Sequence, residues 1–194
     1  MLENFNILIV GIGGQGIITP TRVLAMSCLL QGYDIKTSEL RGLSQRGGSV
    51  QTHIRFGKKI YSPLIKQGDT DLIIALEIKE GLNAIIYANK LKTSFLINNF
   101  YQTTPADKLK HSNQQIIKTV QKTAKKVIVL PATKIAIQEA MNPALAGILL
   151  LGYASFTKII PIKPKIIIQA MAHVIPSNYL TTNQKVFNFA KSLL

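Results

Sequence analysis

The chain has 194 residues, a length that suits one domain, and 47% of them are hydrophobic, which excludes a disordered chain because a sizeable core can be buried. Its 23 lysines and arginines outnumber 9 acidic residues. The formal charge of +14 fits nucleic acid, anionic cofactors or an acidic protein as a partner, or simply a solvated surface rich in lysine. The single cysteine, Cys28, excludes an internal disulfide framework and a four-thiolate iron–sulfur site within the chain.

The first elements predict a βαβ unit. Residues 5–10 form an apolar run that glycines end, as expected of a buried parallel strand. Residues 15–31 carry apolar side chains at helical spacing, and Gly32 ends that helix. Residues 33–39 are a second strand candidate, so a strand, a glycine turn, a helix and a strand follow one another.

The middle of the chain continues to alternate strands and helices. A polar loop at residues 40–49 leads into residues 50–56, whose strict alternation predicts a strand with one exposed face and His53 on its polar side. This strand is expected to turn at residues 57–59 into a short strand at residues 60–61. Buried strands are predicted at residues 71–76, 94–98 and 127–130, and helices at residues 77–91 and 114–125.

After residue 131 only helices are predicted, at residues 134–141, 143–157, 165–173 and 183–194. We therefore expect a single domain over residues 1–194, with an α/β sheet core in residues 1–130 and a helical C-terminal portion in residues 131–194. The expected fold class is α/β: a Rossmann-like doubly wound sheet, mostly parallel, with helices on both faces.

The first candidate site is the glycine turn between the first strand and the first helix. The segment from Gly11 to Gly16 reads GIGGQG and fits the pattern GxGxxG. Glycines let the backbone turn tightly and approach a diphosphate, which the positive helix N-terminus attracts. Glu39, at the end of the second predicted strand, lies where an acidic residue would bind a ribose. Two interpretations stay open: a dinucleotide site, or glycines that only permit close packing of helix and strand.

The second candidate site is the loop at residues 37–49, which reads TSELRGLSQRGGS. It holds two arginines and three glycines and follows the carboxyl end of a strand, where α/β domains bind ligands. Arginine donors suit phosphate or carboxylate, and the glycines would let main-chain N–H groups join in. The alternative is a plain turn whose arginines pair with Glu39.

The other reactive side chains predict neither a catalytic nor a metal site. Cys28 lies in an apolar helical run and is interpreted as an inert core thiol. His111 and His173 have no carboxylate or cysteine at metal-ligand spacing, and His53 is placed on the polar side of its strand. The chain lacks a nucleophile elbow as well, so we assign no catalytic residue.

Membrane and secretion signals are not expected either. The apolar stretch at residues 7–10 is too short for a signal peptide, and residues 143–153 fall short of the roughly 20 apolar residues that a membrane span needs. We therefore expect a cytoplasmic protein.

Several segments, in the right order and spacing, resemble a known family. They are the glycine loop, Thr37-Ser38-Glu39, Gly42, Ser44-Gln45-Arg46-Gly47-Gly48-Ser49-Val50 and Tyr61-Ser62-Pro63-Leu64-Ile65. They resemble the beta subunit of indolepyruvate ferredoxin oxidoreductase and, more widely, the gamma domain of pyruvate and ketoisovalerate ferredoxin oxidoreductases. The similarity continues through residues 71–77 and covers residues 5–155; the glycine loop combined with residues 45–49 is its most specific part.

The resemblance implies a non-cluster accessory subunit of a thiamine-dependent 2-oxoacid:ferredoxin oxidoreductase of the indolepyruvate type. Such enzymes oxidatively decarboxylate a 2-oxoacid to an acyl-CoA and pass two electrons to ferredoxin. Thiamine diphosphate and the iron–sulfur clusters belong to other domains, here a large partner subunit, and the gamma-like domain helps to form the coenzyme A path. The resemblance thus implies no cofactor held by this chain alone, and no activity without the partner.

The residues expected to face a ligand or the subunit interface come from both loops. They are Gly11, Gly13, Gly14, Gln15, Gly16, Glu39, Arg46, Gly47 and Gly48. None of them is assigned a bond-making role.

Other functions stay open at this point. A free-standing NAD(P)-binding Rossmann dehydrogenase is opposed because no catalytic His, Lys or Tyr constellation accompanies the glycine loop, and the sequence after residue 130 does not show a substrate domain. A nucleic-acid-binding module is opposed by scattered lysines without interleaved aromatics, and the fold could also serve another assembly. The expected partners are the large subunit and, through the complex, ferredoxin, with neither nucleic acid nor membrane; a homodimer is left open.

Overall fold

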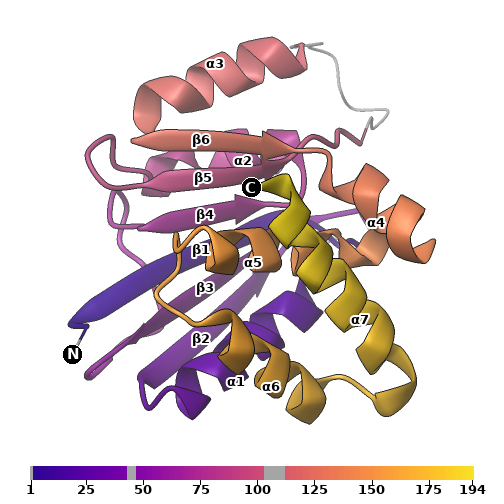
Figure 1. Cartoon of the computed structure of the whole chain (residues 1–194). Helices are drawn as coiled ribbons and strands as arrows, with labels where there is room; N and C mark the ends of the chain where they lie inside the picture. The colour runs from indigo at the N-terminus through magenta and orange to yellow at the C-terminus, as the bar shows by residue number, and fades with distance from the viewer. Residues whose placement is uncertain (1, 43–46, 103–111) are drawn as a thin grey trace.

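The computed structural model describes residues 2–42, 47–102 and 112–194, which form a six-stranded mixed sheet flanked by helices (Figure 1). The strand order is β2-β3-β1-β4-β5-β6. The strands are β1 (Asn4–Ile12), β2 (Asp34–Arg41), β3 (Ser49–Gly57), β4 (Leu72–Ala75), β5 (Ser94–Asn98) and β6 (Lys126–Leu130). β1, β4, β5 and β6 pair in parallel, whereas β3 runs antiparallel to both of its neighbours, β1 and β2. The predicted α/β class with a mostly parallel sheet is confirmed.

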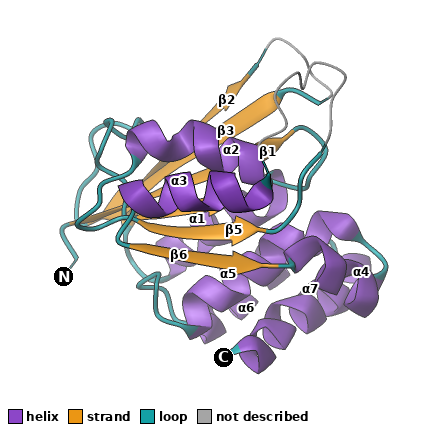
Figure 2. Cartoon of the chain, turned by 90° about the horizontal axis from the view of Figure 1, so that it is seen from above, coloured by secondary structure: helices purple, strands orange, loops and turns teal. Residues whose placement is uncertain are grey.

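Helices cover both faces of the sheet (Figure 2). One face carries α1 (Ile18–Leu30), α4 (Ala132–Ala140), α5 (Ala146–Phe156), α6 (Pro164–Val174) and α7 (Ser177–Phe189); the other carries α2 (Ile78–Asn83) and α3 (Asn113–Thr123). Short 3-10 turns, η1 (Ala84–Tyr87), η2 (Pro143–Leu145) and η3 (Ala190–Leu193), adjoin these helices. Alternation along β1 divides the core, because Ile7 and Ile9 lie under α1 and α5 whereas Leu8 and Val10 lie under α2 and α3.

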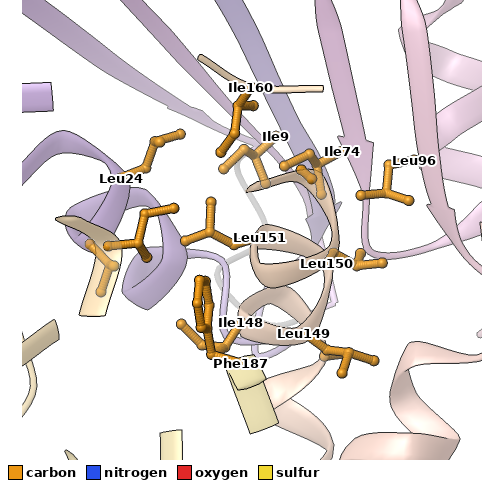
Figure 3. Packing of buried hydrophobic residues seen from close by; sticks show 14 of the residues in the cluster. Ile9, Leu24, Ile74, Leu96, Ile148, Leu149, Leu150, Leu151, Ile160 and Phe187 are labelled. Carbon is orange, nitrogen blue, oxygen red and sulfur yellow. The ribbon is translucent and has the colours of Figure 1, made fainter. Parts of the chain in front are cut away.

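Helix α5 is the centre of the larger core. A helix that is apolar nearly all round is expected to be buried, and α5 presents leucine and isoleucine side chains toward the strands, α1 and α7 (Figure 3). Gly152 lets α7 come close, since a Cβ there would lie 2.5 Å from the carbonyl oxygen of Phe187. Helix α7 is therefore attached to the sheet through α5, whereas α6 packs mainly against α1. Within the described parts of the chain, none of the helices combines the length and the apolar character that crossing a membrane requires.

Several elements differ from the predictions; the last helix, for example, begins at Ser177 and not at residue 183. β1 and β2 are parallel, as the βαβ interpretation requires, but β3 is inserted between them. The short strand predicted at residues 60–61 is absent, and the amide of Ile60 donates instead to Asp34 Oδ2 at 2.7 Å. The helix predicted over residues 77–91 is shorter: α2 ends at Asn83, and the 3-10 turn η1 continues to Tyr87. The side chain of Asn89 accepts from the Leu91 amide at 2.9 Å, a local bond that competes with helix continuation.

His53 is another departure, because the side chain predicted on an exposed polar face is 1% exposed. The segment after β3 folds over this part of the sheet, and the amide of Ile65 donates to His53 Nδ1 at 3.2 Å. The edge of the Tyr87 ring meets the imidazole with 5.3 Å between centroids. Burial lowers the pKa of His53 below its ordinary value.

We expect the folded chain to lose stability as the pH falls below about 6.5, the ordinary pKa of histidine. The fold favours neutral His53, so the unfolded chain binds the proton more readily and acid favours unfolding. Urea unfolding at pH 7.5 and 5.5 should show a smaller loss in His53→Gln than in the wild type. Substituting the exposed His173 by glutamine is the control, and an equal loss in all three proteins would contradict the expectation.

Candidate functional site

The two glycine-containing loops meet at the carboxyl end of β1. The amide of Gly13 donates to the carbonyl oxygen of Gly48 at 2.9 Å, and the amide of Gly42 donates to that of Ser49 at 3.1 Å. Ile12 lies opposite Ser49 in the strand register, so the end of β1 leads directly into this contact. Of the predicted site residues in the second loop, Gly47 and Gly48 are placed here, whereas Arg46 lies outside the described residues.

The glycines of the first loop serve different purposes. Gly14 and Gly16 have φ angles of 99° and 78°, in the region that favours glycine. A Cβ on Gly16 would lie 2.3 Å from the carbonyl oxygen of Ala144, and one on Gly11 would lie 2.8 Å from Gln15 Oε1. A Cβ on Gly14 would meet no atom within 4 Å. Gly11 and Gly16 therefore permit close packing, while Gly14 faces open space.

Gln15 holds the glycine loop in shape. Its side-chain Oε1 accepts from the main-chain amide of Ile12 at 2.9 Å, and its main-chain amide donates to the Ile12 carbonyl oxygen at 3.1 Å. Its Nε2 is buried and has no hydrogen-bond partner among the described residues. A small pocket of about 140 Å³ borders this side chain together with Thr133 and Pro143.

A larger pocket of about 370 Å³ opens between the glycine loop, the start of α1 and β2. Its lining residues are Ile12, Gly13, Gly14, Gly16, Ile17, Ile18, Thr19, Glu39, Arg41, Gly42 and Val50. The first turn of α1 has no acidic residue and no side-chain cap, so its positive N-terminus is available to an anion. Four of the predicted residues thus line one pocket: Gly13, Gly14, Gly16 and Glu39.

Glu39 does not lie where a simple dinucleotide site has its ribose-binding acidic residue, on a strand next to β1. It lies opposite Thr52 of β3, which in turn lies opposite Ile9, so one strand separates Glu39 from β1. Its Oε1 accepts from Arg41 Nε at 2.8 Å, and this hydrogen bond raises the pKa of Arg41. The carboxylate is therefore already paired within the protein, and its charge at the pocket rim is offset by Arg41.

The chain is similar to known proteins along nearly its whole length. It matches the model of the family described as pyruvate ferredoxin/flavodoxin oxidoreductase over residues 6–192. The chain belongs to this family.

Curated relatives within the family confirm the resemblance found in the sequence. Indolepyruvate oxidoreductase subunit IorB of Pyrococcus horikoshii is 29% identical over 194 residues, which cover 96% of this chain and 94% of the relative. The IorB subunit of Archaeoglobus fulgidus is 35% identical over 158 residues, or 77% of each protein. The chain is thus homologous to accessory subunits of 2-oxoacid:ferredoxin oxidoreductases.

Solved structures of the family share the fold. Pyruvate oxidoreductase subunit PORC of Thermotoga maritima superposes with a TM-score of 0.71 at 17% identity, covering 98% of this chain and 96% of that one. The 2-oxoglutarate:ferredoxin oxidoreductase of Magnetococcus marinus gives a TM-score of 0.74 at 17% identity, covering 100% of this chain but 31% of that chain. The fold therefore occurs both as a separate subunit and as part of a longer chain.

Behind the loops lie two buried carboxylates that sequence reasoning did not select as site residues. Glu77 is 0% exposed and caps α2: its Oε2 accepts from the Glu80 amide at 2.8 Å and its Oε1 from the Gln102 amide at 3.3 Å. Burial raises the pKa of Glu77. Glu80 accepts a hydrogen bond from the hydroxyl of Ser49. An acidic residue at the end of an apolar strand, with glutamate three residues later, is the capping signal that points to this pair.

The described residues contain no group of three or more His, Cys, Asp or Glu side chains that could hold a metal ion. Cys28 is fully buried in α1, and burial raises the pKa of its thiol, which disfavours the thiolate that a metal would need. Around the pocket, the described residues offer main-chain amides, a helix N-terminus and the paired charges of Glu39 and Arg41.

Proposed function

We propose that the chain is the accessory subunit of an indolepyruvate-type 2-oxoacid:ferredoxin oxidoreductase and acts only together with a larger partner subunit. The observation that carries the proposal is the nearly end-to-end match with an IorB subunit, which leaves little of either protein unmatched. The reaction is the oxidative decarboxylation of a 2-oxoacid to an acyl-CoA, with two electrons passed to ferredoxin.

The partner subunit would hold thiamine diphosphate and the iron–sulfur clusters. This division fits the residues present here, because one buried cysteine cannot supply the thiolates of a cluster. The positive surface of this chain also fits a partner with acidic surface groups. Among the described residues, carboxylates of Glu39, Asp69, Asp71 and Glu139 are already paired with arginine or lysine.

The pocket beside the glycine loop suits part of coenzyme A, whose thiol would accept the acyl group in the complex. The N-terminus of α1, the open side of Gly14 and the guanidinium of Arg41 are groups that favour a phosphate. Its volume of about 370 Å³ is near the lower end of ligand pockets, so the partner subunit would complete the site. We also include Arg46, Gly47 and Gly48 among the residues proposed to face the ligand, because the sequence resemblance includes them.

Reconstitution tests this function directly. The purified chain alone should show no 2-oxoacid-dependent reduction of a viologen dye, whereas its complex with the large subunit should turn over with indolepyruvate and coenzyme A. Omitting coenzyme A from the assay of the complex is the control. Turnover by the isolated chain, or an assembled complex that is inactive with every 2-oxoacid, would refute the proposal.

Calorimetry separates this function from that of a nicotinamide-dependent dehydrogenase. We expect the isolated chain to bind neither NAD nor NADP, because Glu39 is engaged by Arg41 and lies on β2, which β3 separates from β1. Coenzyme A should bind only when the large subunit is present. A nicotinamide dinucleotide bound at about 10 μM, equivalent to roughly −6.8 kcal/mol, would favour the dehydrogenase instead.

A further inference from the structure

The buried carboxylate of Glu80 is not explained by the helix that carries it. Its neighbour Glu77 uses both oxygens to accept main-chain amides and so caps α2. Glu80 is 7% exposed, and its Oε1 accepts from Asn83 Nδ2 at 3.3 Å within the same helix. Its Oε2, however, accepts from the hydroxyl of Ser49, which belongs to β3 and lies far away in the sequence. A buried carboxylate is costly unless hydrogen-bonded, so this long-range contact is the feature that needs an explanation.

Ser49 lies where the two glycine loops are joined. It begins β3 directly after Gly47 and Gly48, and Gly47 has a φ of 74° that fixes the turn. The carbonyl oxygen of Gly48 accepts from Gly13, and that of Ser49 accepts from Gly42. A continuous set of hydrogen bonds and adjacent residues therefore runs from Glu80 through Ser49 and Gly48 to the glycine loop.

The pocket of about 370 Å³ lies at the glycine-loop end of this set. Gly13 and Gly42 line it, whereas neither Glu80 nor Ser49 does. Any effect of Glu80 on a ligand in this pocket must pass through the loops that Ser49 connects. A charge-assisted hydrogen bond is about twice as strong as a neutral one, which makes a buried carboxylate suited to holding a glycine-rich turn in one conformation.

We propose that Glu80 is a positioning residue: its hydrogen bond to Ser49 fixes Gly48, directly before β3, against Gly13 of the first glycine loop and so preforms the pocket for coenzyme A. The identity of the ligand as coenzyme A rests on the function proposed above. The coupling between Glu80 and the Gly13–Gly48 contact does not depend on that function. Removing the bond leaves the lining residues unchanged and loosens their relative placement.

Amide hydrogen exchange on the isolated chain tests the coupling without any assay of activity. In Ser49→Ala and Glu80→Gln, exchange of the Gly13 amide should accelerate about tenfold relative to the wild type, and Ser49→Thr, which keeps the hydroxyl, should restore protection. The Leu76 amide, bonded to the Val10 carbonyl oxygen at 2.8 Å, should be unaffected. Unchanged protection of Gly13 in Ser49→Ala would overturn the proposal.

Kinetics of the assembled oxidoreductase test the consequence for the ligand. Ser49→Ala should raise the KM for coenzyme A about tenfold and leave kcat at saturating coenzyme A within about twofold, with recovery in Ser49→Thr. Ser155→Ala is the matched control: it also removes a buried hydroxyl, bonded to the Ile162 carbonyl oxygen at 2.8 Å, but far from both loops.

If the KM for coenzyme A rose equally in Ser49→Ala and Ser155→Ala, Glu80 would have only a structural role, and the positioning proposal would be overturned. If the wild-type complex showed no turnover that depends on coenzyme A, the proposed function would fail instead. Hydrogen exchange at Gly13 would then still decide whether Glu80 and Ser49 control the loop contact.

Discussion

Replacing Gly16 with alanine is expected to destabilise the folded chain by about 3 kcal/mol. Two physical effects add. Gly16 has a φ of 78°, where an L-residue costs roughly 1–2 kcal/mol, and its Cβ would lie 2.3 Å from the carbonyl oxygen of Ala144 in η2. The clash involves main chain, which cannot move without displacing the start of α5.

Gly14→Ala is the matched control for Gly16→Ala. Its φ of 99° adds the same kind of backbone strain, but a Cβ there would meet nothing within 4 Å. Urea unfolding should therefore show a loss of about 1–2 kcal/mol for Gly14→Ala and a clearly larger one for Gly16→Ala. Equal losses would mean that the approach of η2 does not depend on glycine at residue 16.

The two glycine variants also show what the sequence could reveal about the loop. The GxGxxG spacing predicts a tight turn between a strand and a helix, and the structure has one. It does not tell a glycine needed for packing from one that faces a ligand, because the atom that excludes a side chain at Gly16 belongs to Ala144, far along the chain. The contact of Gly13 with Gly48 likewise joins two loops whose proximity depends on strand pairing.

The positions of the strands along the chain could be predicted from the sequence more easily than which strands lie next to each other in the sheet. β5 was predicted from its apolar run at residues 94–98 and is found at Ser94–Asn98, because a buried parallel strand has a strong local signature. The insertion of β3 between β1 and β2 has no local signature, since pairing is set by contacts between distant residues. His53 shows the same limit: alternation correctly predicted its strand, but the segment that covers it follows β3 and cannot be read from the alternation.

The substitution of Asn98 by alanine is expected to destabilise the chain by about 3 kcal/mol, because buried groups left without partners cost about 1–3 kcal/mol each. Asn98 is 1% exposed at the carboxyl end of β5. Its Nδ2 donates to the Leu76 carbonyl oxygen at 2.9 Å and to Thr133 Oγ1 at 2.7 Å, and its Oδ1 accepts from the Thr133 amide at 3.0 Å. These bonds join the ends of β4 and β5 to the start of α4. They also hold Thr133 beside Gln15.

Asn99→Ala provides the comparison, because Asn99 is exposed and contributes its main-chain amide to a bond with the Leu130 carbonyl oxygen. Its loss of stability should stay within about 0.5 kcal/mol. Asn98→Asp then separates lost hydrogen bonds from lost volume. The aspartate nearly matches asparagine in size and can still accept from the Thr133 amide, but when ionised it has no donor for the Leu76 carbonyl oxygen. We expect Asn98→Asp to be about as unstable as Asn98→Ala in urea unfolding at pH 7. Wild-type stability in the aspartate variant would show that packing, and not the hydrogen bonds, secures α4 against the sheet.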